Sequence, residues 1–413
     1  MVFKCQEDSF LREFSSRVLH CEEAELPAPS GKGANLRGYS VVCEDTILFP
    51  EGGGQPCDFG YLAGKRVLNV VRKGDTAIHF VESAEPLNPG QEVRQEIDWE
   101  RRKDHMQQHS GQHLVTALFE REYNMETKAW WLGSDTTYIE LGAKDVSQEQ
   151  LDCVERMANN LIASAKNVSV SVFKSVDNLS DEVTRATRGL PKDHVGPIRV
   201  VTIEDVEGNM CCGTHVTNLS QLQVIKMLNV EKTKNKLLVH FLVGDRVVKK
   251  LATSFKRELE MNIVLNGGPS SHLELLGKLQ TNLKKYQRQV KSLLKDIAIN
   301  EGEKLKSASL KPKYFFIHRT DGSDAEFLTN FLRAAGDLPD TFVFATSVDD
   351  SSNGQMILQG NPEVIGKLGG EVCELLGGKG NGKGSTYRAK ITNTKNIKKA
   401  EALIVQHFGE IEQ

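Results

Sequence analysis

The spacing of apolar positions changes several times along the chain, and the first change separates a β-rich region from a helical one. Up to about residue 95, short β-prone runs at 39–43, 46–49 and 77–81 are separated by Gly, Pro and Asp. Such punctuation is typical of a small β-barrel or sandwich. We therefore predict a β-barrel domain over residues 1–95.

The next region mixes helices and strands. From Asp98 onward apolar residues recur at helical spacing, and Ser147 with Gln150 has the spacing of a capping box at the start of a second helix. Strand-like runs follow at 168–172, 198–203, 222–225 and 237–241. This order predicts an α+β domain over residues 96–245.

A sustained heptad pattern marks the third region. Its apolar positions are spaced alternately by three and four residues, at Leu276, Leu279, Leu283, Tyr286, Val290, Leu293 and Ile297. A shorter amphipathic stretch over 248–265 precedes them, and a turn-forming segment at 266–270 separates the two. We predict an antiparallel helical hairpin over residues 246–309, which is either a projecting spacer or a surface for self-association. Most of its lysines need no role beyond solvation.

Residues 310–413 have the pattern of a compact α/β domain. Strand-like and helical runs alternate, at 314–317, 325–335, 341–345, 355–358 and 364–376. Segment 377–384, rich in glycine and lysine, lies before the strand-like run 386–391. We predict a built-in loop there that binds phosphate through backbone N–H groups and lysines, with a flexible tether as the alternative. The four regions together predict an α+β protein.

Composition indicates a cytoplasmic protein. The chain has 413 residues, 39% hydrophobic and 26% charged, which is ordinary for a globular protein of several domains. No apolar run reaches the roughly 18 residues of a membrane span, and the N-terminus lacks a signal-peptide pattern. The eight cysteines are scattered, so we expect free thiols rather than structural disulfides. A net charge of −3 restricts any RNA site to local basic patches.

Two short motifs carry the strongest chemical signal. His109 and His113 are four residues apart on a predicted helix, so both imidazoles can face one point. Cys211 and His215 repeat this spacing in a connection after a predicted strand. Imidazoles with one thiolate suit tetrahedral Zn²⁺, and we predict a zinc site from these four residues. The alternative is a chance histidine pair with a cysteine that packs as a small apolar group.

The residues between the two histidines disfavour one class of zinc enzyme. Metalloproteases of the H-E-x-x-H type place a general-base Glu there, whereas this chain has Ser110, Gly111 and Gln112. Peptide hydrolysis by that mechanism is therefore not expected.

The order of the motifs resembles a known family. Glu51-Gly-Gly-Gly-Gln-Pro56 with Asp58 and Gly60 comes first, then His109-x-x-x-His113, then Cys211-x-Gly-Thr-His215. This succession resembles the editing domain of alanyl-tRNA synthetase and the free-standing AlaX editing proteins. The heptad region and segment 377–384 look like that synthetase's C-terminal region, so the resemblance covers nearly the whole chain. No segment resembles the aminoacylation domain.

Two details refine the resemblance. Threonyl-tRNA synthetase editing domains share the histidine and cysteine pairs, but the glycine motif around Gln55 and segment 377–384 favour the alanine system. The usual Cys-Gly-Gly-Thr-His reads Cys211-Cys212-Gly-Thr-His here. Cys212 is therefore a competing candidate ligand, although Cys211 matches the family's cysteine.

The resemblance implies a trans-editing deacylase that hydrolyses mischarged tRNA(Ala), Ser-tRNA(Ala) first and Gly-tRNA(Ala) second, without aminoacylation. A pocket built for alanine rejects such near-isosteres only about a hundredfold, so a second hydrolytic sieve is needed. In the family both motif pairs hold zinc, which carries over to His109, His113, Cys211 and His215. The zinc would activate water, orient the substrate or be purely structural, and sequence does not choose among these. The expected catalytic group is a zinc-ordered water rather than a side chain.

Further residues are candidates for substrate contacts. The amino-acid pocket is predicted to include Gly52, Gly53, Gly54 and Gln55, with Thr46 and Thr214 recognising a serine hydroxyl. Candidate tRNA contacts are Lys379, Lys383 and Arg388. The C-terminal segment would either read the tRNA or mediate self-association, and the helical hairpin is the other candidate for self-association.

Two other classes of function compete with editing. One is a tRNA-binding or scaffold protein with a purely structural zinc, which would bind tRNA without deacylating it. The other is a zinc hydrolase of a small molecule, which would turn over without tRNA and show no salt dependence of substrate affinity.

Overall fold

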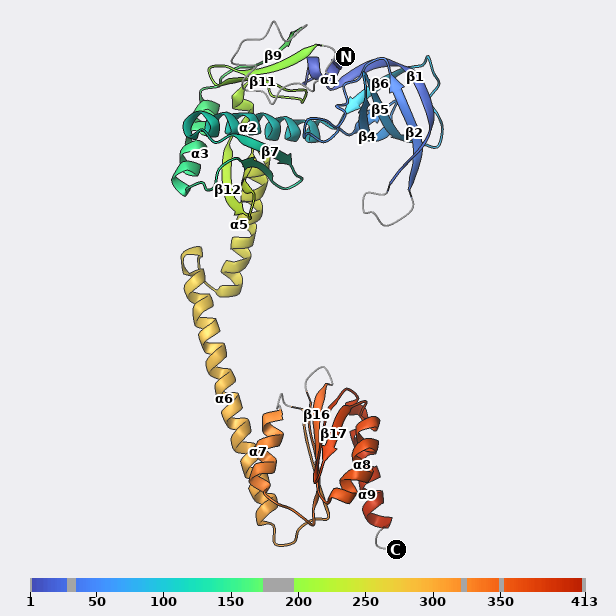
Figure 1. Cartoon of the computed structure of the whole chain (residues 1–413), viewed down its shortest axis with the longest axis vertical. Helices are drawn as coiled ribbons and strands as arrows, with labels where there is room; N and C mark the ends of the chain where they lie inside the picture. The colour runs from blue at the N-terminus through green and yellow to red at the C-terminus, as the bar shows by residue number, and fades with distance from the viewer. Residues whose placement is uncertain (1, 28–34, 174–196, 321–324, 349–352, 411–413) are drawn as a thin grey trace. The chain divides into compact units, whose positions relative to one another are not determined.

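The computed structural model describes residues 2–27, 35–173, 197–320, 325–348 and 353–410. The chain forms two compact units, Met1–Leu259 and Glu260–Gln413, and both combine helices with β-sheets (Figure 1). The predicted α+β class is confirmed. Among the described residues, no helix has the length and apolar character needed to cross a membrane.

The first unit begins with a short helix and a closed six-stranded barrel. Helix α1 is Lys4–Glu7, and the strands are β1 (Glu13–Leu26), β2 (Leu36–Cys43), β3 (Gly60–Leu62), β4 (Lys65–Lys73), β5 (Thr76–Glu82) and β6 (Glu92–Ile97). They close in the order β1-β2-β5-β4-β3-β6. Alternate residues such as Val18, Val41 and Val67 are buried inside it, as expected for strands with one inward face. The predicted barrel is therefore confirmed.

One predicted strand of this region is wrong. Residues 46–49 lie in a connection without strand structure. Their backbone N–H groups bond to side chains: Ile47 donates to Gln95 Oε1, and Phe49 donates to Asp58 Oδ2. Because side chains satisfy these donors, the segment needs no partner strand.

Two long helices and two sheets follow the barrel. The helices are α2 (Trp99–Tyr123) and α3 (Gln148–Ala163). One sheet has the order β12-β13-β8-β7, from Ile225–Lys232, Leu237–Val243, Thr137–Leu141 and Thr127–Leu132. The other has the order β11-β10-β9, from Glu207–Met210, Ile198–Ile203 and Val168–Phe173. The capping box is confirmed, since Ser147 Oγ accepts from the Gln150 N–H. The predicted strand at 222–225 is wrong, because the 3-10 helix Leu219–Leu222 ends there and β12 starts at Ile225.

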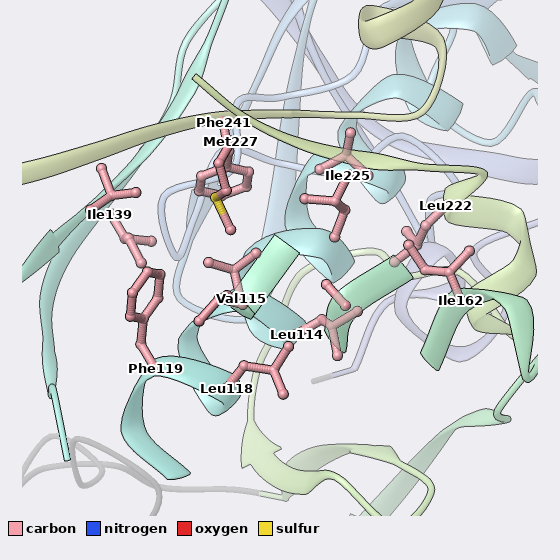
Figure 2. Close-up of a cluster of buried hydrophobic side chains, with 14 of the residues drawn as sticks. Leu114, Val115, Leu118, Phe119, Ile139, Ile162, Leu222, Ile225, Met227 and Phe241 are labelled. Carbon is pink, nitrogen blue, oxygen red and sulfur yellow. The ribbon is translucent and has the colours of Figure 1, made fainter. Parts of the chain in front are cut away.

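Helix α2 is anchored in the core of this region. Its residues Leu114, Val115, Leu118 and Phe119 are fully buried and pack in one cluster with residues of α3 and the four-stranded sheet (Figure 2). A Cβ at Gly111 would lie 2.5 Å from a methyl group of Val243. The glycine therefore lets α2 approach β13 closely.

A buried ion pair joins the barrel side to α2. Arg102 of α2 donates through Nε to Asp58 Oδ2 at 3.0 Å, and both side chains are fully buried. The same guanidinium donates to the carbonyls of Ser9 and Ile47. These bonds fix the start of α2, and hence the two histidines farther along it, against the barrel.

Two helices occupy the predicted hairpin region. They are α5 (Asp245–Leu265) and α6 (His272–Ser307), with the 3-10 helix η3 (Pro269–Ser271) between them. The helices are confirmed, and their antiparallel pairing stays a prediction. The heptad residues of α6 are exposed from Leu276 to Leu293.

The C-terminal part of the second unit is a five-stranded sheet with helices on both faces (Figure 1). The sheet order is β14-β15-β16-β18-β17, from Tyr314–Arg319, Phe342–Val348, Gly354–Gln359, Thr386–Ile391 and Lys379–Lys383. Helix α7 (Ala325–Ala335) packs with α6 on one face, and α8 (Pro362–Leu375) and α9 (Ile397–Glu410) pack on the other. The 3-10 helix η4 (Thr394–Asn396) precedes α9.

The predicted glycine and lysine loop is wrong in its main part. Residues Lys379–Lys383 form edge strand β17, which pairs with β18 from Lys379↔Lys390 to Lys383↔Thr386. A Cβ at Gly380 would lie 2.1 Å from the Arg388 carbonyl oxygen. Glycine here serves close strand pairing, so the segment does not wrap a phosphate.

Candidate metal centre

The structure brings the four predicted ligands together. His109 and His113 extend from α2, and Cys211 and His215 from the connection after β11. One ligand atom from each lies within 4.8 Å of the others. Cys211 Sγ is 3.4 Å from His109 Nε2 and 3.2 Å from His215 Nε2. This spacing and the mixed nitrogen and sulfur donors fit a tetrahedral metal ion.

Each histidine of the cluster is oriented by a partner on its outer nitrogen. The Nδ1 partners are Gln55 Oε1 for His109 (2.9 Å), Glu207 Oε1 for His113 (3.2 Å) and Ser110 Oγ for His215 (3.0 Å). An oxygen partner on Nδ1 leaves the Nε2 lone pair free for a metal, which is the usual arrangement of ligand histidines. Glu207 and Ser110 were not predicted as partners. The fold brings them beside the histidines, and no regular spacing in the sequence indicates this.

The surroundings of Cys211 favour the deprotonated thiolate form of its side chain. Burial alone would raise the pKa of Cys211, but the three imidazoles outweigh burial and hold this pKa well below 9.0. Burial lowers the pKa of His215 to about 3. Burial also opposes the charged form of His113, yet Cys211 and Glu207 raise its pKa to about 10. A deprotonated thiolate among imidazoles is the form that binds a divalent metal.

Gln55 joins the barrel to the segment after β11 that carries Cys211 and His215, which we call the ligand connection. Its Oε1 accepts from the Thr214 N–H at 3.0 Å, and its Nε2 donates to Thr214 Oγ1 at 2.8 Å. Gln55 and Thr214 are both completely buried. Gln55 therefore positions a ligand, in addition to its predicted place beside the amino-acid pocket.

Close approach of the ligand connection to α2 depends on Gly213. A Cβ at this position would lie 2.2 Å from His109 Cε1 and 2.8 Å from Gln55 Oε1. No side chain fits there without displacing a ligand.

The glycine motif forms a tight turn that points Gln55 inward. Gly52 and Gln55 exchange backbone hydrogen bonds of 3.1 Å in each direction. Gly53 and Gly54 between them have φ angles of 59° and 85°, the conformation of a two-residue turn that favours glycine. Gly53 and Gly54 are exposed, so the turn has an outer surface while Gln55 is buried.

The N-terminal segment and Arg199 hold the ligand connection from another side. Gln6 Nε2 donates to the Cys212 carbonyl at 2.7 Å, and Arg199 Nη1 donates to the Cys211 carbonyl at 2.7 Å. Arg199 Nε also donates to the Gln6 carbonyl. The side chain of Cys212 is exposed and lies outside the ligand cluster. The arrangement favours Cys211 over Cys212 as ligand.

Thr46 lies apart from the other predicted pocket residues. Its hydroxyl oxygen lies 2.8 Å from His79 Nε2 and 3.0 Å from Gln95 Oε1, inside the barrel. It also accepts from the Leu48 N–H. The hydroxyl is engaged by barrel residues, so Thr214 is the better placed of the two threonines.

A basic face lies on the C-terminal sheet. Lys390 of β18 is the cross-strand partner of Lys379 on β17 and of Gln355 on β16. Arg388 of β18 is the cross-strand partner of Asn381 on β17. Within the described residues no ion pair joins Lys379, Lys383, Arg388 or Lys390 to an acidic side chain. A hollow of about 280 Å³ is lined by Lys379, Arg388 and Lys390 together with residues of β16 and α7. We call Lys379, Lys383, Arg388 and Lys390 the basic sheet face.

Sequence comparisons with known proteins indicate one family. The profile described as "Threonyl and Alanyl tRNA synthetase second additional domain" matches residues 198–238, which include Cys211 and His215. The chain is 42% identical over 414 residues to alanyl-tRNA editing protein Aarsd1-A of Xenopus laevis, covering 100% of this chain and 99% of the relative. It is 44% identical over 412 residues to alanyl-tRNA editing protein Aarsd1 of Mus musculus, covering 99% and 98%. It is 29% identical over 437 residues to the putative alanyl-tRNA editing protein alaX of Saccharomyces cerevisiae, covering 95% and 93%.

Proposed function

Because the chain belongs to the family of alanyl-tRNA editing proteins, we propose that it is a zinc-dependent deacylase acting in trans on mischarged tRNA(Ala). Ser-tRNA(Ala) is the first substrate and Gly-tRNA(Ala) the second, and the chain attaches no amino acid to tRNA. The observation that carries the proposal is the four-residue cluster of His109, His113, Cys211 and His215, whose ligand atoms lie within 4.8 Å of one another. Each of its imidazoles has an oxygen partner on the outer nitrogen.

The reaction breaks the ester between the amino acid and the terminal ribose. It needs a positioned water, stabilisation of the oxyanion and a fixed substrate. Zinc held by the four ligands would supply an electrophilic centre for these needs. The chain's own contribution is to fix that centre. Gln55 orients His109, and the Cys211 carbonyl is held by Arg199.

Thr214 is the residue we propose for recognition of the serine hydroxyl. Its Oγ1 accepts from Gln55 Nε2, so its own hydroxyl hydrogen remains to be donated to a serine oxygen. Gly52, Gly53 and Gly54 carry no side chain, and we propose that they line the amino-acid pocket with backbone alone, which a small amino acid can approach closely. Alanine lacks the hydroxyl that this contact would recognise.

The basic sheet face is the part of the C-terminal domain that we propose to contact tRNA. Lys379 and Lys390 are direct cross-strand partners. Two positive charges in these positions repel each other, and an anion bound between them would offset the repulsion. A phosphate backbone supplies such anions without requiring a particular sequence. Self-association through the exposed heptad residues of α6 is a further proposal, tested by sedimentation of the full chain.

Two ligand variants test the function. His109→Ala and Cys211→Ala should each lose bound zinc and deacylation of Ser-tRNA(Ala), measured by metal analysis and a deacylation time course. Cys212→Gly, outside the cluster, should keep both. Wild-type turnover in a zinc-free variant would refute the metal assignment.

The choice of substrate is tested by hydrolysis of Ser-, Gly- and Ala-tRNA(Ala) side by side. We expect serine and glycine to be removed and alanine to be spared. Failure on all three, with tight tRNA binding preserved, would instead select a tRNA-binding protein with a structural zinc.

A further inference from the structure

Trp130 lies directly against the metal cluster and has no role in the account given so far. Its ring centroid is 4.7 Å from that of His109, with the two ring planes inclined by 34°. The glycine turn is also close to the indole: a Cβ at Gly54 would lie 2.7 Å from Trp130 Cζ2. The indole therefore lies against both a predicted ligand and the turn, where a residue larger than glycine would collide with it.

Solvent reaches the surroundings of the cluster on this side. Trp130 is half-buried, and Gly53 and Gly54 are exposed. By contrast, Gln55 and Thr214, which also lie beside the cluster, are completely buried. Trp130 belongs to edge strand β7, and its cross-strand partner Ile139 is in the core. The backbone under the indole is therefore fixed. Part of the indole packs against the hydrophobic core of this region, and the rest of its surface is exposed.

The proposed substrate brings an aromatic group to this place. Its reacting ester is on the ribose of the terminal adenosine of tRNA, so only the sugar separates the adenine ring from the reacting carbonyl. A single-stranded base is typically held by stacking on an aromatic side chain. Tryptophan offers the largest aromatic surface for such a contact.

We propose that Trp130 is the platform on which the terminal adenine stacks, and that this contact places the ester beside the metal cluster. The inference rests on the proposed deacylase function and adds a nucleobase subsite to it. Recognition at this subsite depends on the base and not on the amino acid. It is therefore the same for seryl and glycyl substrates.

Three substrates and three variants test the proposal. Trp130→Leu should lower kcat/KM about 10- to 100-fold for both Ser-tRNA(Ala) and 3′-O-seryl-adenosine, mainly through KM. Hydrolysis of seryl methyl ester, which has no base, should be unchanged, as should the zinc content. Trp130→Phe should recover most of the loss. Trp131→Leu, at the neighbouring exposed position, should behave as wild type.

A binding measurement separates this proposal from the proposed function. The chain has three tryptophans, so Trp99→Phe combined with Trp131→Phe leaves Trp130 as the sole indole. Adenosine 5′-monophosphate should quench its fluorescence saturably. Quenching in a protein that deacylates no tRNA would support the subsite while the proposed function fails. An active enzyme without quenching, or an equal loss on all three substrates in Trp130→Leu, would overturn the stacking role and leave Trp130 as packing against His109.

Discussion

Gln55 Oε1 lies 2.9 Å from His109 Nδ1, so an amide from the barrel turn fixes the ring of a ligand on helix α2. This hydrogen bond keeps the proton of His109 on Nδ1, so the Nε2 lone pair, 3.4 Å from Cys211 Sγ, is available to a metal ion in the cluster. The same oxygen accepts from the Thr214 N–H. One amide therefore couples both halves of the metal centre, although more than fifty residues separate it from His109.

Replacement of this amide should weaken the metal site without removing a ligand. We expect Gln55→Leu to lower zinc affinity about 10- to 100-fold, the usual cost of losing the partner of a ligand histidine. Competition with a fluorescent chelator measures the affinity. Gln280→Leu on the exposed part of α6 serves as the matched control. Unchanged affinity in Gln55→Leu would show that His109 needs no such partner.

A methyl group at residue 213 should have a larger effect on the same site. In Gly213→Ala the new Cβ would lie 2.2 Å from His109 Cε1, so either the imidazole or the ligand connection has to move. We expect loss of stoichiometric zinc, seen by metal analysis, and destabilisation of about 1–3 kcal/mol in urea unfolding. Gly277→Ala is the control, because nothing lies within 4 Å of a Cβ built there. Full zinc retention in Gly213→Ala would contradict the close packing.

The sequence was sufficient to predict which four residues cluster, because spacing carries that information. Two residues four apart on a helix share one face, so His109 and His113 were predictable as a pair. The small residues next to Cys211 and His215 marked the second pair. Glu207 and Ser110 could not be predicted, since they reach the cluster only through the packing of β11 and α2.

Glycine-rich segments were harder to interpret, because glycine permits several conformations. Gly53 and Gly54 do form a turn with positive φ, as the motif suggested. Gly380 and Gly382 instead lie in a strand, where the absence of a side chain permits close approach to β18. Both segments are rich in glycine, so composition alone does not distinguish a turn from a strand. Pairing with a neighbouring strand determines which of the two forms.

The barrel should show a pH dependence that comes from His79. This residue is completely buried, and burial lowers its pKa from 6.5 to about 4. Between these values the unfolded chain binds a proton that the folded barrel does not, so the free energy of unfolding falls as pH drops from 6.5 to 4. His79 alone should contribute about 3 kcal/mol to this loss.

Urea unfolding of chelator-treated protein at pH 7 and pH 4.5 measures this dependence without a contribution from metal release. His79→Gln should make this dependence smaller but not abolish it, because burial also lowers the pKa of His105 and of His215 to about 3, and both still titrate. His20→Gln, at an exposed position, should keep the full slope. Equal pH dependence in wild type and His79→Gln would refute the assignment to His79.

The basic sheet face should contribute to tRNA affinity through charge alone. The triple variant Lys379→Gln, Arg388→Gln, Lys390→Gln removes three cations from one side of the sheet. Each phosphate contact contributes about 0.7–0.9 to the dependence of log affinity on log salt, so the slope should become shallower by about 2. Filter binding over a range of salt concentrations measures it.

A matched variant on the other side of the same sheet decides whether position matters. Lys395, Lys398 and Lys399 are exposed residues of η4 and α9, and α9 covers the opposite face. Their replacement by Gln changes the net charge by the same amount. If tRNA lies on the basic sheet face, only the first triple variant loses affinity at moderate salt, while deacylation of saturating Ser-tRNA(Ala) stays near wild type in both. Equal losses in the two variants would mean that tRNA responds to overall charge and that this face is not its binding surface.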